Sequence, residues 1–195
     1  ERVGYTFAGW NYDFSTPIRE NINAVASWNA NTYRILYHAN GGTIDVDSVE
    51  VTYNEPFTLI DMVRDGYVFE GWYADGYLIQ AGTWNRTSDL TLEAKWKLLT
   101  YSLTYDLAGG TSVGENPSSF TVESGMIHLA NPTRENYIFA GWTGTGLTTP
   151  TLVLDIPQGS TGDRKYTANW TFSGFRITYN LNGGDTNGGN PTEFS

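Results

Sequence analysis

The sequence predicts a mostly β, α+β fold of small tandem modules, each with about four strands and a short helical segment. The first observation is a Tyr-x-Phe-x-Gly-Trp motif that occurs three times and ends at Trp10, Trp72 and Trp142. The second is an Ala-x-Trp motif that follows each copy and ends at Trp28, Trp96 and Trp170. The third is an aromatic segment that leads each time to a glycine pair: Gly41-Gly42, Gly109-Gly110 and Gly183-Gly184.

The spacing of these motifs indicates true internal repeats. Trp28 and Trp96 are 68 residues apart, and so are Gly42 and Gly110. The next intervals, from Trp96 to Trp170 and from Gly110 to Gly184, are both 74 residues. Because two independent landmarks move by the same amount, the chain is predicted to be a tandem array of small units.

The central motif itself predicts a strand with a local irregularity. Tyr and Phe two residues apart fall on one face of a strand, because side chains alternate with period two. Glycine before tryptophan suggests a β-bulge or a close backbone approach covered by the large ring. We expect the recurring rings to form the cores: Tyr5, Phe7, Trp10, Trp28, Tyr67, Phe69, Trp72, Trp96, Tyr137, Phe139, Trp142 and Trp170.

Residues 1–31 are predicted to be the C-terminal half of a repeat. Its first strand covers Tyr5–Trp10, and Ala24–Trp28 is the closing strand. Between them, Ser15 or Thr16 before Pro17 predicts a helix start, because proline is favoured at the first helical position. One or two helical turns are expected there.

Residues 32–97 are predicted to be a complete repeat. Its strands are expected at Arg34–Tyr37, Val49–Tyr53, Tyr67–Tyr73 and Leu92–Trp96, with an Asn-Gly-Gly turn after the first. The apolar run Phe57–Val63 fits either a short helix or a connecting strand.

Residues 98–171 are predicted to be a second complete repeat with an insertion. Strands are expected at Tyr101–Leu107, Ser119–Glu123, Tyr137–Trp142 and Lys165–Trp170. The segment 144–162 is rich in Gly and Thr and is expected to be a surface insertion. Residues 172–195 then form the N-terminal half of another repeat.

Composition restricts the functional classes. The chain has no cysteine, so it can form no disulfide, thiol nucleophile or cysteine metal site. A net charge of -10 without a Lys/Arg cluster argues against nucleic acid as a partner. No apolar run approaches the ~20 residues of a spanning helix. Since Glu1 opens inside a repeat, we expect a piece of a longer polypeptide, with any targeting or anchoring segments outside it.

The recurring residues favour structure over catalysis. Arg2, Arg64 and Arg134 are the charged residues that recur at the main motif, and an arginine stacked on a ring or bonded to a turn carbonyl is favoured over a ligand anchor. His38 and His128 occupy unrelated repeat positions, so no metal site or catalytic triad is built twice. We predict no catalytic residue, no cofactor and no metal.

Two weaker candidate sites remain open. Asp45, Asp47 and Glu50 could contribute oxygens to a calcium site, although a solvated acidic edge is the favoured interpretation. Trp84, Tyr73 and Tyr77 lie outside or beside the core motif, and they are the candidates for ligand contact on a sugar-binding platform.

With these motifs in place, the whole chain resembles the Listeria–Bacteroides repeat family, also called the internalin B-repeat. The resemblance rests on Pro132–Trp142, which reads Pro-Thr-Arg-Glu-Asn-Tyr-Ile-Phe-Ala-Gly-Trp, and on Leu92-Glu93-Ala94-Lys95-Trp96. Departures are Asn136 where glycine is usual, and Asp61-Met62-Val63 before Arg64. The resemblance implies a β-grasp-like module, found in tandem on large bacterial surface proteins and associated with adhesion, spacing or partner contact.

The function expected from this resemblance is a non-enzymatic, extracellular repeat segment of a bacterial surface protein attached to the cell surface or cell wall. It would act as a stalk or as an adhesive surface toward a host or neighbouring cell-surface protein or glycan. The alternative is a carbohydrate-binding accessory module of a secreted enzyme. The two terminal halves are complementary, so we also expect them to pair with each other. Pairing between neighbouring molecules is favoured over pairing within one chain, and no membrane insertion is expected.

Overall fold

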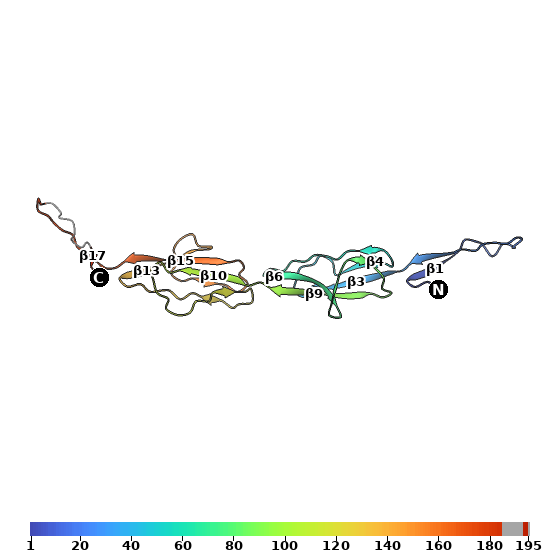
Figure 1. Cartoon of the computed structure of the whole chain (residues 1–195), viewed down its shortest axis with the longest axis horizontal. Coiled ribbons are helices and arrows are strands. Elements are labelled where there is room, and N and C mark those ends of the chain that lie inside the picture. Colours follow the sequence, from blue (N-terminus) through green and yellow to red (C-terminus); the bar gives the residue numbers. More distant parts are fainter. Residues whose placement is uncertain (185–192, 195) are drawn as a thin grey trace. The chain divides into compact units, whose positions relative to one another are not determined.

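The described part of the chain consists of strands and turns and contains no helix. The computed structural model describes residues 1–184, 193 and 194 (Figure 1). The chain divides into two compact units, Glu1–Leu98 and Leu99–Ser195, each with one large sheet. The prediction of a mostly β chain is therefore confirmed, whereas the prediction of a short helical segment is wrong.

The segment that was expected to be helical, after Pro17, forms turns and irregular structure. Asp13 organises a turn here: its Oδ1 accepts the Ser15 backbone N–H at 2.9 Å, and its carbonyl accepts the Thr16 N–H at 3.1 Å. Hydrogen bonding from Ser15 lowers the pKa of Asp13. A helix of one or two turns does not repay its nucleation cost unless an apolar face packs on a neighbour, and Ile18 is exposed.

The first complete repeat contains a five-stranded sheet in the order β4-β3-β9-β6-β7. Its strands are β3 (Thr32–His38), β4 (Ser48–Thr52), β6 (Tyr67–Ala74), β7 (Tyr77–Ile79) and β9 (Leu90–Leu98). β3 and β9 run parallel at the centre, and the remaining neighbours are antiparallel. A separate antiparallel pair joins β5 (Pro56–Phe57) to β8 (Gly82–Thr83). The ambiguous run Phe57–Val63 is thus not a helix, and its Met62 enters the core.

The second complete repeat contains a four-stranded sheet in the order β11-β10-β15-β13 and a separate pair, β12-β14. The strands are β10 (Tyr101–Asp106), β11 (Ser119–Phe120), β12 (Ile127–His128), β13 (Tyr137–Gly144), β14 (Asp155–Ile156) and β15 (Arg164–Phe172). β10 and β15 are parallel, like β3 and β9. The expected surface insertion at 144–162 is in part wrong, because Leu154 and Ile156 are buried core residues. A Gly/Thr-rich composition does not show which apolar residues point inward.

Each end of the chain carries a two-stranded antiparallel pair. β1 (Tyr5–Trp10) pairs with β2 (Ala26–Ala30), and β16 (Phe175–Arg176) pairs with β17 (Glu193–Phe194). Of the half repeat predicted at 172–195, residues 185–192 and 195 lie outside the described residues. Asn31 links the first hairpin to the first repeat: its N–H donates to the Gly4 carbonyl, and its own carbonyl accepts the Tyr53 N–H, both at 2.9 Å.

The predicted bulge before each motif tryptophan is confirmed in all three copies. The strand register shifts between Phe7 and Gly9, between Phe69 and Gly71, and between Phe139 and Gly141. These glycines have φ of 134°, 119° and 115°, a region that L side chains rarely adopt. Phe and Trp are three residues apart and would face opposite sides of a regular strand. The extra residue of the bulge brings their rings to the same face, with centroids 5.4–5.5 Å apart.

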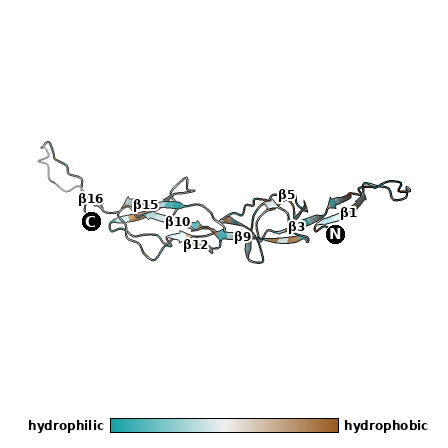
Figure 2. Cartoon of the chain, turned by 45° about the vertical axis from the view of Figure 1, so that its right-hand side comes forward, coloured by the Kyte–Doolittle hydropathy of each residue, from teal (hydrophilic) through white to brown (hydrophobic). Residues whose placement is uncertain are grey.

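The cores confirm the central role of the motif tryptophans. Trp72 and Trp142 are 1% and 0% exposed, and Trp96 and Trp170 pack against the same clusters while partly buried. The strands carry both hydrophilic and hydrophobic stretches (Figure 2), and β9 buries every second residue over its first half. The core prediction is wrong for Phe7 and Trp10 within one chain, because these rings are 45% and 51% exposed.

Candidate interaction surface

In both complete repeats, the closing tryptophan holds the glycine-pair turn. Nε1 of Trp96 donates to the Ala39 carbonyl at 2.9 Å, and Nε1 of Trp170 donates to the Leu107 carbonyl at 2.9 Å. The second glycine of each pair, Gly42 or Gly110, lies so close to the ring that a Cβ atom there would overlap it. Both glycines are therefore required, for different reasons. The first has a positive φ, and the second leaves room for the indole because it has no Cβ.

The recurring arginine closes the same turn from the other side. The Arg64 guanidinium stacks on Tyr67 at 3.7 Å and donates to the Asn40 carbonyl at 3.0 Å. Arg134 repeats both contacts, with Tyr137 at 3.8 Å and with the Ala108 carbonyl at 3.0 Å. The structural interpretation of this arginine is thus confirmed in both complete repeats. We call this arrangement of arginine, tryptophan and glycine-pair turn the turn lock.

The N-terminal half repeat contains the arginine and the tryptophan of the turn lock, Arg2 and Trp28, but in the described structure they hold no glycine-pair turn. Arg2 stacks on Tyr5 at 3.8 Å, but within the described residues neither its guanidinium nor Nε1 of Trp28 has a hydrogen-bond acceptor. These side chains line a groove of about 680 Å³ together with the rings of Phe7 and Trp10. In the second repeat the equivalent rings, Phe139, Trp142 and Trp170, belong to the core. We call the groove of the N-terminal half the open face.

The open face is a preformed aromatic cluster. Phe7 packs edge-on against Trp10 at 5.4 Å and against Trp28 at 5.4 Å, the same geometry that Phe139 makes with Trp142 and Trp170. The hairpin therefore holds its rings in the arrangement found in the complete repeats.

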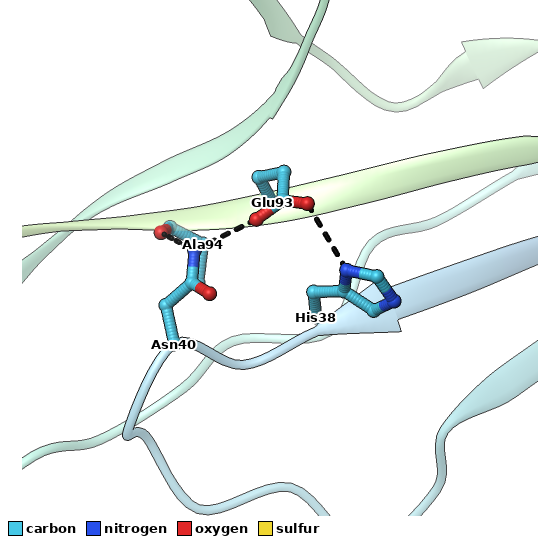
Figure 3. Close-up of polar contacts among 4 residues, drawn as sticks. All are labelled: His38, Asn40, Glu93 and Ala94. Atoms are coloured by element: carbon cyan, nitrogen blue, oxygen red, sulfur yellow. Dashed lines mark hydrogen bonds and ion pairs between the residues drawn. The ribbon is translucent and has the colours of Figure 1, made fainter.

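The first repeat adds a polar network at its turn (Figure 3). Glu93 on β9 contacts His38 Nδ1 at 3.0 Å and accepts a hydrogen bond from Asn40 Nδ2 at 2.9 Å, while the same Nδ2 donates to the Ala94 carbonyl at 3.0 Å. Hydrogen bonding from Asn40, with a smaller effect of His38, lowers the pKa of Glu93. Because His38 and Glu93 are exposed, the network tethers the turn and does not form a buried proton-transfer site.

The two histidines form unrelated pairs. His38 contacts Glu93, whereas His128 contacts Asp155 at 2.7 Å in the second repeat. Among the described residues, no group of three or more His, Asp or Glu side chains converges as a metal site would require. Asp45, Asp47 and Glu50 are exposed and do not form such a group.

The residues predicted for ligand contact lie in three different environments. Trp84 is 1% exposed and packs edge-on against Phe57 at 5.5 Å, so the exposure assumed for it is wrong. Tyr73 is half-buried, with Lys95 Nζ 4.0 Å from its ring centroid. Tyr77 is 75% exposed. A tryptophan outside a repeated motif looks like a surface residue in sequence, but Trp84 packs in the core cluster of the first repeat.

Sequence reasoning missed the tyrosine that faces the motif tryptophan. Tyr37 is 4% exposed with its ring 4.6 Å from Trp72, and Tyr105 lies 6.0 Å from Trp142. Burial, helped by the nearby Tyr166, raises the pKa of Tyr105 to about 12. The signal was present, because both tyrosines recur five residues before the second glycine of the pair.

Fold and turn lock together define a class of small tandem β repeats closed by an Arg–Trp clamp on a glycine-pair turn. The sequence pattern of the Listeria-Bacteroides repeat domain matches residues 33–95 and 101–172. The chain therefore belongs to the Listeria–Bacteroides repeat family.

Two proteins of Evansella cellulosilytica are similar to nearly the whole chain. One, named "Putative membrane protein", is 29% identical over 95% of this chain and 29% of its own length. The other, named "Putative Gly-rich membrane protein", is 28% identical over 98% of this chain and 24% of its own length. The chain thus spans less than a third of either relative. No solved structure matches it. Within the described residues, no helix has the length and apolar character needed to cross a membrane.

Proposed function

We propose that this chain is a non-enzymatic, extracellular repeat segment of a large bacterial surface protein, acting as a stalk or adhesive surface. The observation that carries the proposal is the turn lock. The side chains that recur in every copy, arginine and tryptophan above all, are engaged in closing the fold of the complete repeats. A repeated catalytic site would need reactive residues at equivalent positions, and the polar pairs His38–Glu93 and His128–Asp155 are not equivalent.

The names of the relatives support a place in the cell envelope, since both are membrane proteins by name and much longer than this chain. The lack of cysteine and the net charge of -10 suit a tandem array that folds without disulfides and stays soluble outside the cell. We expect the protein to be attached to the cell surface or cell wall. The partner would be a surface protein or glycan of a host or neighbouring cell.

We also infer that each complete repeat is β-grasp-like. The first and last long strands lie parallel at the centre of each sheet, with the second strand on one side and the third on the other. The helix usual in that fold would be replaced by the crossovers 53–66 and 121–136, which contain the short strands β5 and β12 and contribute Met62 and Leu129 to the cores.

Surface exposure can be tested with antibodies raised against the 195-residue chain. Intact cells that express the parent protein should bind the antibody without permeabilisation, whereas an antibody against a cytoplasmic protein of the same cells should not bind. Labelling that appears only after permeabilisation would overturn the extracellular placement. Deleting one complete repeat from the parent would then separate the two roles: a spacer keeps its adhesion to host cells, and an adhesive surface loses it.

The second candidate function, carbohydrate binding as an accessory module of a secreted enzyme, is favoured by the exposed ring of Tyr77 on β7. Its neighbour Leu78 is also exposed, at 48%. A glycan array with the wild-type chain and Tyr77→Ala tests this function directly. Val153→Ala is a matched control, because Val153 is 74% exposed in the other repeat. Binding lost in Tyr77→Ala and kept in Val153→Ala would support the sugar platform, and no binding by the wild type would exclude it.

A further inference from the structure

One tryptophan of the complete repeats has no acceptor for its indole N–H. The other tryptophans donate this N–H to a carbonyl or side-chain oxygen at 2.7–3.1 Å: Trp72, Trp96, Trp142 and Trp170. Nε1 of Trp84 is buried, in a residue that is 1% exposed, and it has no hydrogen-bond partner among the described residues. Because buried N–H groups are almost always paired, this indole needs an acceptor that the described chain does not supply.

Trp84 lines a pocket of about 210 Å³ in the first repeat. The lining comes from β5, β7 and β8 and from the segment that leads into β9, and Phe57 and Ile79 belong to its apolar wall. The backbone of Trp84 is fixed on both sides, because its N–H donates to the Glu55 carbonyl at 2.9 Å and its carbonyl accepts the Asn54 N–H at 2.7 Å. The pocket is smaller than the ~300–1,000 Å³ of sites for drug-sized ligands, so it suits a single small ring.

The polar part of the lining is rich in free hydrogen-bond donors. Gln80, Asn85 and Arg86 line the pocket, and their side chains have no hydrogen-bond or ion-pair partner within the described part of the chain. Arg86 is the one charged residue of this lining, although the whole chain has a net charge of -10. The next carboxylate along the chain, Asp89, lies outside the lining and accepts the Arg34 backbone N–H at 2.8 Å. The pocket therefore offers one positive charge that no carboxylate of its own lining neutralises.

These groups match a sugar acid better than a neutral sugar or a phosphate ester. A guanidinium binds a carboxylate through two parallel hydrogen bonds. An amide side chain both donates and accepts, as a sugar hydroxyl requires, and an indole N–H only donates, so it needs an oxygen. A single arginine balances the one charge of a carboxylate, whereas a phosphate ester carries about −1.5 to −2 charges. The lining therefore favours a small ring that carries one carboxylate and several hydroxyls.

We propose that this pocket binds a uronic acid unit of an acidic polysaccharide. The carboxylate pairs with Arg86, and one oxygen of the sugar accepts the indole N–H of Trp84. The hydroxyls bond to the amides of Gln80 and Asn85. The ring of Tyr77 on β7, which is 75% exposed, offers a stacking surface for a further unit of the polysaccharide. The inference rests on the proposed contact with a glycan and names the chemistry of that glycan.

Two-dimensional NMR of the indole N–H signals of the 195-residue chain, one for each of the seven tryptophans, tests the proposal. The probe is glucuronate, and glucose at the same pH and ionic strength is its neutral counterpart. Glucuronate should shift the assigned Trp84 signal in a saturable way and leave the motif tryptophans nearly unchanged. Glucose should bind about tenfold more weakly or less, because it lacks the charge-assisted hydrogen bonds to Arg86.

Two charge variants separate the pocket from the general field of the protein. Arg86→Gln should weaken glucuronate binding about tenfold and leave glucose binding unchanged. Lys97→Gln removes the same charge from an exposed position outside the lining, and it should bind glucuronate like the wild type. Both substitutions lie at exposed positions, so the fold is kept.

The outcomes also distinguish this inference from the proposed function. An unshifted Trp84 signal, equal affinity for glucose and glucuronate, or equal weakening by both charge variants would each overturn the uronic acid site. Neutral glycans that bind on the array without any response to glucuronate would overturn this inference and leave glycan contact standing. A chain that binds neither glucuronate nor any glycan of the array would overturn both.

Discussion

The same tryptophan substitution should have very different effects in a closed and an open repeat. Trp142 and Trp10 occupy equivalent motif positions, but Trp142 is 0% exposed and Trp10 is 51% exposed. A buried indole removes about 200 Å² from water, which at ~25 cal/mol/Å² is an upper estimate of about 5 kcal/mol. Nε1 of Trp142 also donates to Asn131 Oδ1 at 3.1 Å, and its loss leaves that oxygen without this donor.

We therefore expect Trp142→Ala to lower the free energy of unfolding of the second repeat by roughly 3–5 kcal/mol. Since small domains are stable by roughly 5–15 kcal/mol, much of the repeat would unfold in mild denaturant. Trp10→Ala should cost about 1 kcal/mol or less in the monomer, because half of the ring already contacts water. Trp72→Ala in the first repeat should behave like Trp142→Ala, since Trp72 is 1% exposed.

Urea denaturation followed by hydrogen exchange, resolved to peptides of each repeat, measures these values. Trp142→Ala should affect peptides from residues 101–172 and leave those from 33–95 unchanged. The reasoning would be refuted if Trp10→Ala cost as much as Trp142→Ala, or if Trp142→Ala cost under about 1 kcal/mol.

Three further predictions concern the turn lock and the buried tyrosine. Gly42→Ala should destabilise the first repeat by about 1–3 kcal/mol, because its Cβ would overlap Trp96, while Gly82→Ala has open space and should be neutral in the same urea titration. Arg64→Lys should cost roughly 0.5–1 kcal/mol, because an ammonium cannot both stack on the tyrosine and reach the turn carbonyl as the guanidinium does; equal urea midpoints would contradict this. The pKa of Tyr105 is raised from 10.0 to about 12 in the folded repeat, so its contribution to stability is complete below pH 10 and is lost as the pH rises through about 12. Tyr105→Phe should flatten this alkaline fall of the urea midpoint, and an unchanged pH profile would contradict the assignment.

The parts of the candidate site that could be predicted from the sequence are the residues that recur in each repeat. The bulge glycine, the buried motif tryptophan and the structural arginine each recur at fixed spacing, and all are confirmed in the complete repeats. The helix after Pro17 and the exposure of Trp84 were wrong for a common reason. Local residue preferences describe which conformations a segment tolerates, but burial depends on what the rest of the chain places against it.

The amino-acid sequence by itself determined the number and spacing of the repeats, the mostly β class and the family, because these follow from self-similarity and from period-two alternation along single strands. The tertiary structure alone decided which partners the recurring residues contact. The parallel pairing of β3 with β9 brings Trp96 onto a turn 54 to 57 residues earlier in the chain, and no local pattern encodes that distance. It also showed that the motif tryptophan is buried in both complete repeats and half exposed on β1. Burial differs between identical motifs because the apolar face of a strand is covered only by the elements that pack over it.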